Sequence, residues 1–156
     1  MAILEIKKAG DPVLKQVAAP IERLTKWHRQ ILDDMAETMY SADGVGLAAP
    51  QVGKSLRMVV IDVQDEHGLL ELINPVITVR EGSVIDSEGC LSVPKVFGDV
   101  ERAQCVTVEY IDRRSRRRSL TAEGLLARCI QHECDHLDGK LFIDIAVCLR
   151  KEEDKE

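Results

Sequence analysis

The pentapeptide His132-Glu133-Cys134-Asp135-His136 constrains the fold of this 156-residue chain more than any other feature. It falls within Glu123 to Asp138, where apolar residues recur at helical spacing and Gly139 is well placed to end the helix. Because residues four apart share a helix face, both imidazoles can reach one cation, with Glu133 near a water molecule on it. The alternative is a solvated face that happens to hold two histidines. The apolar residues before the motif favour a largely buried helix instead.

Two histidines leave such a metal site short of a protein ligand. Phe142 stands where many metalloproteases have a third histidine, and His28 and His67 lie in segments where exposed polar roles are expected. Five cysteines without a CxxC pair cannot all form disulfides within one chain, so a thiol is the next candidate. Cys90 follows a glycine that permits close approach of the backbone, and its thiolate would complete a Cys/His/His site with an open fourth position. An inert buried thiol is the alternative.

The segment Gly44 to Gln51 is apolar, has spaced glycines and ends in an amide side chain. It does not open a helix as a dinucleotide-binding loop does, and no Gly-Lys-Ser/Thr follows it, so phosphate binding is disfavoured. A buried turn is one interpretation. The other is functional, because an amide donor beside a metal-activated water would suit an oxyanion that develops on a carbonyl.

The remaining pattern predicts one long helix followed by several strands. Apolar residues at every fourth position predict an amphipathic helix from Thr25 to about Tyr40, and Asp11 with Pro12 predicts a short helix before it. The expected strands are Met58 to Val63, Leu69 to Ile73, Val76 to Val79, Ser83 to Asp86, Val106 to Ile111 and Arg117 to Thr121.

Short turns between these strands favour an α+β fold over a doubly wound one. We expect mainly antiparallel sheets packed around the C-terminal helix in a single domain that spans residues 1–145. Residues 146–156 are assigned to a charged C-terminal tail, of which Arg150 to Glu156 is expected to fray or to extend a solvated helix.

The formal net charge of −6 argues against polyanion binding as the main role of the chain. The longest uncharged stretch, Gly44 to Gly53, contains a proline and is too short to span a bilayer. Charged residues near the N-terminus argue against a signal peptide. We therefore expect a cytosolic protein with no membrane association and no stable nucleic-acid complex.

Three segments together closely resemble the peptide deformylase family, whose motifs GxGLAAPQ, EGCLS and QHExDH stand in the same order. They are Gly44 to Gln51, Glu88 to Ser92 and Gln131 to His136, and the resemblance extends from Gly10 to Asp144. It implies one divalent metal, natively often Fe(II) and otherwise zinc, nickel or cobalt. The ligands that it implies are Cys90, His132 and His136.

The resemblance also implies a reaction: hydrolytic removal of the N-formyl group from the formylmethionine of nascent polypeptides, with release of formate. Glu133 would be the general acid/base for a metal-activated water, and the Gln51 side chain and Leu91 backbone N–H would stabilise the oxyanion. Two alternatives stay open. One is another metal-dependent amidase or peptidase, and the other is a non-catalytic, metal-stabilised module that binds formylated peptide ends.

An extended peptide is expected to add as a strand beside Val45-Gly46 and Gly89. By the resemblance, its methionine side chain would enter an apolar slot lined by Val45, Leu125 and Cys129.

Two further expectations remain, and only the first comes from the resemblance. Arg102 is expected to pair with Asp43, the alternative being a surface arginine. The run Arg113 to Arg118, five arginines in six residues, is either a solvated turn or a transient contact with ribosomal RNA. Formylated substrates imply a bacterial or organellar setting, and the absence of a transit peptide favours the bacterial cytoplasm. We expect a monomer.

Overall fold

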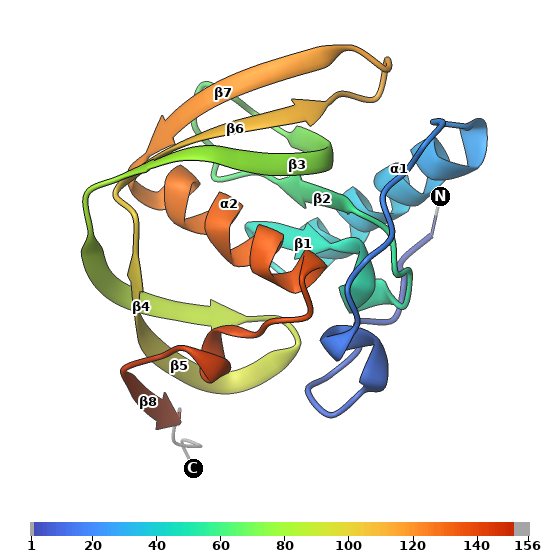
Figure 1. The fold of residues 1–156 in the computed structure, drawn as a ribbon. Helices are drawn as coiled ribbons and strands as arrows, with labels where there is room; N and C mark the ends of the chain where they lie inside the picture. Colours follow the sequence, from blue (N-terminus) through green and yellow to red (C-terminus); the bar gives the residue numbers. More distant parts are fainter. Residues whose placement is uncertain (1, 152–156) are drawn as a thin grey trace.

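The computed structural model describes residues 2–151, which form two antiparallel sheets around one central helix (Figure 1). The larger sheet has the strand order β1-β2-β3-β6-β7 and the smaller has the order β4-β5-β8. The larger sheet consists of Gly46–Ala48 (β1), Met58–Ile61 (β2), Leu70–Glu81 (β3), Cys105–Ile111 (β6) and Arg117–Glu123 (β7). The smaller sheet consists of Val84–Cys90 (β4), Val93–Arg102 (β5) and Cys148–Lys151 (β8). The expected α+β fold with antiparallel sheets is confirmed.

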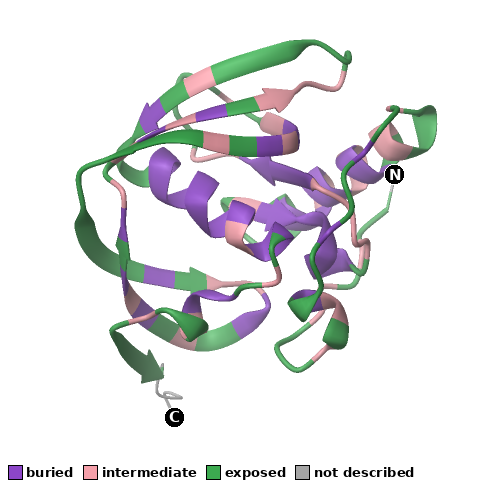
Figure 2. Cartoon of the chain, viewed as in Figure 1, coloured by how far each residue is buried: buried purple, intermediate pink, exposed green. Residues whose placement is uncertain are grey.

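Helix α2, Gly124–Leu137, lies between the two sheets and is buried along nearly its whole length (Figures 1 and 2). Leu126 and Ile130 pack into a core shared with β2, β3 and β6. The helix ends at Asp138, and Gly139 follows with φ +75°. A Cβ at Gly139 would lie 2.5 Å from the Lys15 carbonyl oxygen, so glycine is required there by both φ and space.

Helix α1, Lys26–Ser41, covers the outer side of β1 and β2 and closes a second core. Thr25 begins it with a reciprocal cap: the Thr25 Oγ1 accepts from the His28 N–H, and the His28 Nδ1 accepts from the Thr25 N–H. His28 therefore has a local capping role. Met35 and Met39 are fully buried as the spacing predicts, whereas Trp27 is 56% exposed and lies off that face.

Several segments differ from the expected elements. Val76 to Val79 is part of the long strand β3, in which Asn74, at φ +51°, marks a register shift. Strands β5 and β8 were not expected: they pair with each other through contacts such as Gly98 opposite Leu149, a tertiary pairing that local pattern does not encode. The prediction for the tail is wrong at Arg150 and Lys151, which belong to β8, while residues 152–156 lie outside the described residues.

The Gly44 to Gln51 segment folds as β1 followed by a short 3₁₀ helix, Ala49–Val52, and from Leu47 onward it is buried. Two other 3₁₀ turns are present, Pro12–Lys15, begun by Asp11 and Pro12 as predicted, and Phe142–Asp144. Neither helix in the part of the chain that the structure describes has the length and apolarity of a membrane span.

Candidate active site

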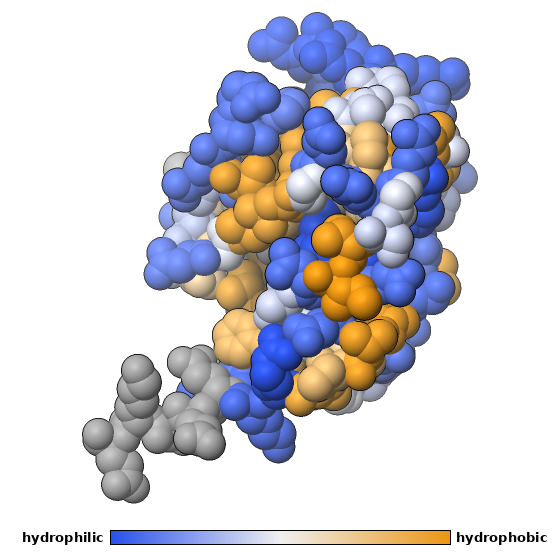
Figure 3. All heavy atoms as spheres, turned by 90° about the vertical axis from the view of Figure 1, so that its left-hand side faces the viewer, coloured by the Kyte–Doolittle hydropathy of each residue, from blue (hydrophilic) through white to orange (hydrophobic). Residues whose placement is uncertain are grey.

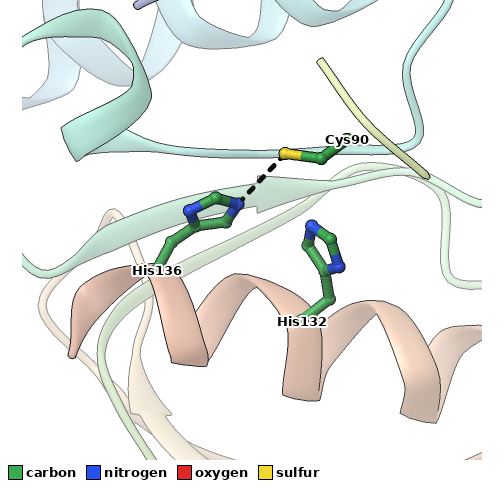
Figure 4. Close-up of side chains that lie close together, drawn as sticks. All are labelled: Cys90, His132 and His136. Carbon is green, nitrogen blue, oxygen red and sulfur yellow. Dashed lines mark hydrogen bonds between the residues drawn. The ribbon is translucent and has the colours of Figure 1, made fainter. Parts of the chain in front are cut away.

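A thiol and two imidazoles converge where the end of β4 meets α2 (Figure 4). Cys90 comes from β4, and His132 and His136 lie one turn apart on α2; their ligand atoms all lie within 4.8 Å of one another. The Cys90 Sγ lies 3.3 Å from the His136 Nε2. One thiol and two buried imidazoles form a donor set that fits a divalent transition metal.

The two imidazoles have different electrostatic surroundings: burial opposes protonation of His132, but hydrogen bonds to Cys90 and Glu88 raise its pKa to about 10. The His132 Nδ1 donates to the Glu88 carboxylate at 2.8 Å, which leaves its Nε2 for a cation. Burial and the neighbouring charges of His132 and Arg102 hold the pKa of His136 well below its usual range. His136 is therefore neutral, which is the form of imidazole that binds a metal.

Glu88 is the centre of a buried ionic cluster behind His132. Its carboxylate accepts hydrogen bonds from Arg102 Nε and Nη2, both at 2.9 Å, and from Arg128 Nη1 at 2.5 Å. Burial opposes ionisation of Glu88, but its hydrogen bonds to Arg102 and His132 outweigh that effect and lower its pKa to about 2. Glu88 is thus a permanently charged acceptor that fixes the His132 ring.

The expected pairing of Arg102 with Asp43 is wrong. Arg102 is buried between β5 and α2, where it binds Glu88 and also donates to the Asp135 Oδ2 at 2.5 Å. Asp43 is exposed in the loop before β1. The inward direction of Arg102 on its strand decides the partner, and spacing along the chain does not reveal that direction.

Glu133 lies on α2 between the two imidazoles and faces Gly46 of β1. Its carboxyl group is buried, and its Oε1 has no hydrogen-bond partner among the described residues. A Cβ at Gly46 would lie 2.5 Å from the Glu133 Oε2, so the absence of a side chain at Gly46 makes room for this carboxyl group. Burial raises the pKa of Glu133 to about 7, against the opposing effect of His132. Such a group can both take up and release a proton near neutral pH.

Gln51 presents its amide N–H groups to the same place. Its Oε1 accepts from the Ala48 N–H at 2.9 Å, which fixes the orientation of the amide. Its Nε2 donates to the Ser92 Oγ at 3.1 Å and lies 3.4 Å from the Cys90 Sγ. A hydrogen-bond donor therefore lies beside the ligand cluster.

A cavity of about 430 Å³ opens beside these groups. Except for His136, every site residue expected from the sequence lines it: Val45, Gly46, Gln51, Gly89, Cys90, Leu91, Leu125, Cys129, His132 and Glu133. Burial raises the pKa of Cys129 to about 12, so this thiol is neutral and inert in the wall. Figure 3 shows apolar groups gathered among hydrophilic ones on the side of the molecule where β7 passes into α2.

Sequence reasoning assigned no site role to several residues around the cavity, and three of them show why. Arg128 and Phe97 line it, and Ser92 accepts the Gln51 amide. Arg128 had a signal, since a charged residue four positions before His132 on a buried helix requires a buried partner. Phe97 had none that local pattern could show, whereas Ser92 is the last residue of the Glu88 to Ser92 motif.

A helix that carries paired histidines and a buried carboxyl group, enclosed by antiparallel sheets and faced by a thiol beside an open cleft, defines the class of metal-dependent hydrolases. Within that class, the family model for polypeptide deformylase matches residues 3–152. The chain belongs to the peptide deformylase family, a family of hydrolases that remove the N-formyl group from nascent peptides.

Individual relatives agree over nearly the whole length. The chain is 52% identical over 152 residues to the peptide deformylase of Halothermothrix orenii, covering 97% of this chain and 99% of that protein. It is 53% identical over 156 residues to the peptide deformylase of Caldanaerobacter subterraneus, covering 100% of this chain and 97% of that protein. Among solved structures, the peptide deformylase of Thermotoga maritima superposes with a TM-score of 0.90 at 41% identity, covering 94% of this chain and 99% of that one. A peptide deformylase of Synechococcus elongatus in complex with actinonin superposes with a TM-score of 0.89 at 49% identity, covering 93% of this chain and 79% of that one.

Proposed function

We propose that this chain removes the formyl group from the N-terminal formylmethionine of nascent polypeptides and releases formate. The observation that carries the proposal is the meeting of three ligand side chains, a buried acid and an amide donor at one end of an apolar cavity. Membership of the family supports the same reaction.

Cys90, His132 and His136 would hold one divalent metal, which we propose to be Fe(II), with zinc, nickel or cobalt able to replace it. When bound, such a metal lowers the pKa of water and polarises a carbonyl oxygen.

The side chains of the chain itself then have separate tasks. The Glu133 carboxylate takes a proton from the attacking water as its oxygen bonds to the formyl carbon. The Gln51 Nε2 and the Leu91 N–H donate to the oxygen on which negative charge develops. Glu133 passes its proton to the departing nitrogen as the C–N bond breaks, which gives formate and a free α-amino group.

The peptide would lie between the edges of the two sheets. Both β1 and β4 are edge strands, so each can pair with an added strand. Val45, Gly46 and Gly89 line the cavity at these edges, and two of the three have no side chain to hinder a backbone. The methionine side chain would fill the slot beside Val45, Leu125 and Cys129.

A matched pair of substrates tests the proposal. We expect formate release from formyl-Met-Ala-Ser and none from the acetyl-blocked peptide of the same sequence. Cleavage of an internal bond alone would identify a peptidase instead, and tight binding without turnover would identify a binding module.

We further infer that the chain acts as a monomer in the bacterial cytoplasm, where its substrate emerges from the ribosome. In the β6–β7 turn, Arg113 pairs with Asp33 and Glu71, and Arg116 pairs with Asp112. Arg118, at the start of β7, also approaches Asp112. These ion pairs support a solvated turn over a transient contact with ribosomal RNA. Co-sedimentation with ribosomes after all five arginines are changed to Ser decides between them, since loss of binding would favour the RNA contact.

A further inference from the structure

Arg128 joins the helix that carries the two histidines to the strand that carries the thiol. It lies one turn before His132 on α2, and its side chain is 8% exposed. Its guanidinium group donates to three acceptors: the Glu88 Oε2 at 2.5 Å, the Val100 carbonyl at 2.9 Å and the Val84 carbonyl at 2.8 Å. The acceptors belong to β4 and β5, so one side chain holds both strands against α2.

This connection matters because the metal ligands come from different elements. Cys90 follows Glu88 by two residues on β4, whereas both histidines are on α2. Glu88 accepts from His132 and from Arg128, so the orientation of the imidazole and the place of the strand depend on one carboxylate. Arg102 provides a second connection at Asp135, on the other side of His132 along the helix.

We propose that Arg128 is a positioning residue that fixes the Cys90 strand relative to the two histidines, and that its forked guanidinium group controls how long a metal stays bound. The inference rests on the proposed metal site but not on the substrate. The planar, forked guanidinium group of Arg128 can donate to three acceptors that lie in different directions, and the ammonium group of a lysine cannot reproduce this arrangement. If Arg128 only balanced the charge of Glu88, lysine would serve equally well.

The test is the rate of cobalt release from the full-length chain loaded with Co(II) and mixed with excess EDTA, followed by the decay of the thiolate-to-cobalt absorption. Changes in groups that orient metal ligands typically alter metal affinity by about 10- to 100-fold. We expect R128M to release cobalt faster by about that factor, and R128K to resemble R128M more than the unchanged chain.

Arg57 offers a matched control. It is also largely buried, at 19% side-chain exposure, and donates to the Leu137 carbonyl and to Asp138 at the end of α2, without contact to Glu88. We expect R57M to lower the melting temperature yet to release cobalt within about twofold of the unchanged rate.

Three results would overturn the proposal. They are an unchanged release rate in R128M, an equal acceleration in R57M, which would indicate general loosening, and an unchanged rate in R128K, which would indicate a charge effect alone. If R128M fails to fold, R128K against R57M still decides. Cobalt release requires no substrate, so a failure of deformylase activity would leave this measurement unaffected.

Discussion

Gly46→Ala tests whether the position of the Glu133 carboxyl group controls the reaction. The added Cβ would lie 2.5 Å from the Glu133 Oε2 and 3.1 Å from its Cγ and Cδ. To restore an ordinary contact, the carboxyl group or β1 must retreat by roughly 0.5 to 0.9 Å. Neither moves freely, because Glu133 lies on a buried helix and β1 pairs with β2 through Gly46 opposite Ile61.

Displacement of a reacting group by about 1 Å lowers rates by roughly 100-fold, which corresponds to about 2.7 kcal/mol of activation free energy. Overpacking adds a loss of about 1 to 3 kcal/mol in the free energy of unfolding. We therefore expect G46A to have a kcat for formyl-Met-Ala-Ser about 100-fold lower. Metal content should stay unchanged, since the three atoms nearest to the added Cβ all belong to Glu133 and not to a proposed ligand.

Gly98→Ala is the matched control. Its Cβ would meet Leu149 Cδ2 at 2.9 Å, Ala146 Cβ at 3.0 Å and Phe142 Cε2 at 3.1 Å, a milder overlap away from Glu133. We expect G98A to lower the melting temperature while kcat stays within a few-fold of the unchanged enzyme. If G46A keeps a kcat within threefold, or if G98A loses as much activity as G46A, the reasoning about the Glu133 position is refuted.

Three further outcomes follow from the site and its surroundings. Glu133→Ala should retain the metal yet lower kcat by about 10²- to 10⁴-fold, and undiminished formate release would contradict the role of Glu133. Removal of the metal by a chelator should lower the melting temperature, because metal at about 100 times its Kd stabilises the folded chain by roughly 2.7 kcal/mol; identical melting curves with and without metal would contradict the assigned ligand site. Burial raises the pKa of Tyr40 to about 12, together with the hydrogen bond to Asp62 and the negative charge of Asp62. The folded chain thus retains a proton that the unfolded chain loses near pH 10, so this contribution to stability disappears as pH rises from about 10 to 12. Absorbance at 295 nm should show a late tyrosine transition that Tyr40→Phe removes, and a Tyr40 transition near pH 10 would contradict it.

Local pattern was sufficient where one segment determines the structure. The helix around His132 could be predicted because its apolar spacing, its glycine end and the pair of histidines lie within one stretch. The strands β2 and β6 likewise have β-rich composition of their own. Cys90 could be proposed as a ligand from the glycine before it and from its motif, but nothing in its spacing to His132 places the two together.

The features that could not be predicted depend on tertiary pairing of strands and on the direction of side chains in the folded chain. Strand β8 exists because Cys148–Lys151 meets the free edge of β5, and its four residues are all exposed, so no burial pattern marks it. Arg102 could be singled out from the sequence, but its partners, Glu88 and Asp135, depend on the inward direction of its side chain on β5. The partners of Arg128 could not be predicted either. The sequence places Arg128 on the same helix face as His132, but only the tertiary fold brings the Val84 and Val100 carbonyls within its reach.

The cluster of the buried Arg102, Arg128 and Glu88 with the half-buried Asp135 has two positive and two negative groups, so its formal charges balance. Balance alone does not explain its presence, because desolvation of buried ions offsets most of their attraction, and apolar replacements of equal volume are often as stable. An apolar core would, however, leave the His132 Nδ1 without an acceptor and would let β4 slide on α2. Directional hydrogen bonds resist such sliding, whereas apolar contacts are non-directional. The cluster therefore adds little net stability for its four ions, and its main effect is to define where Cys90 lies relative to the histidines.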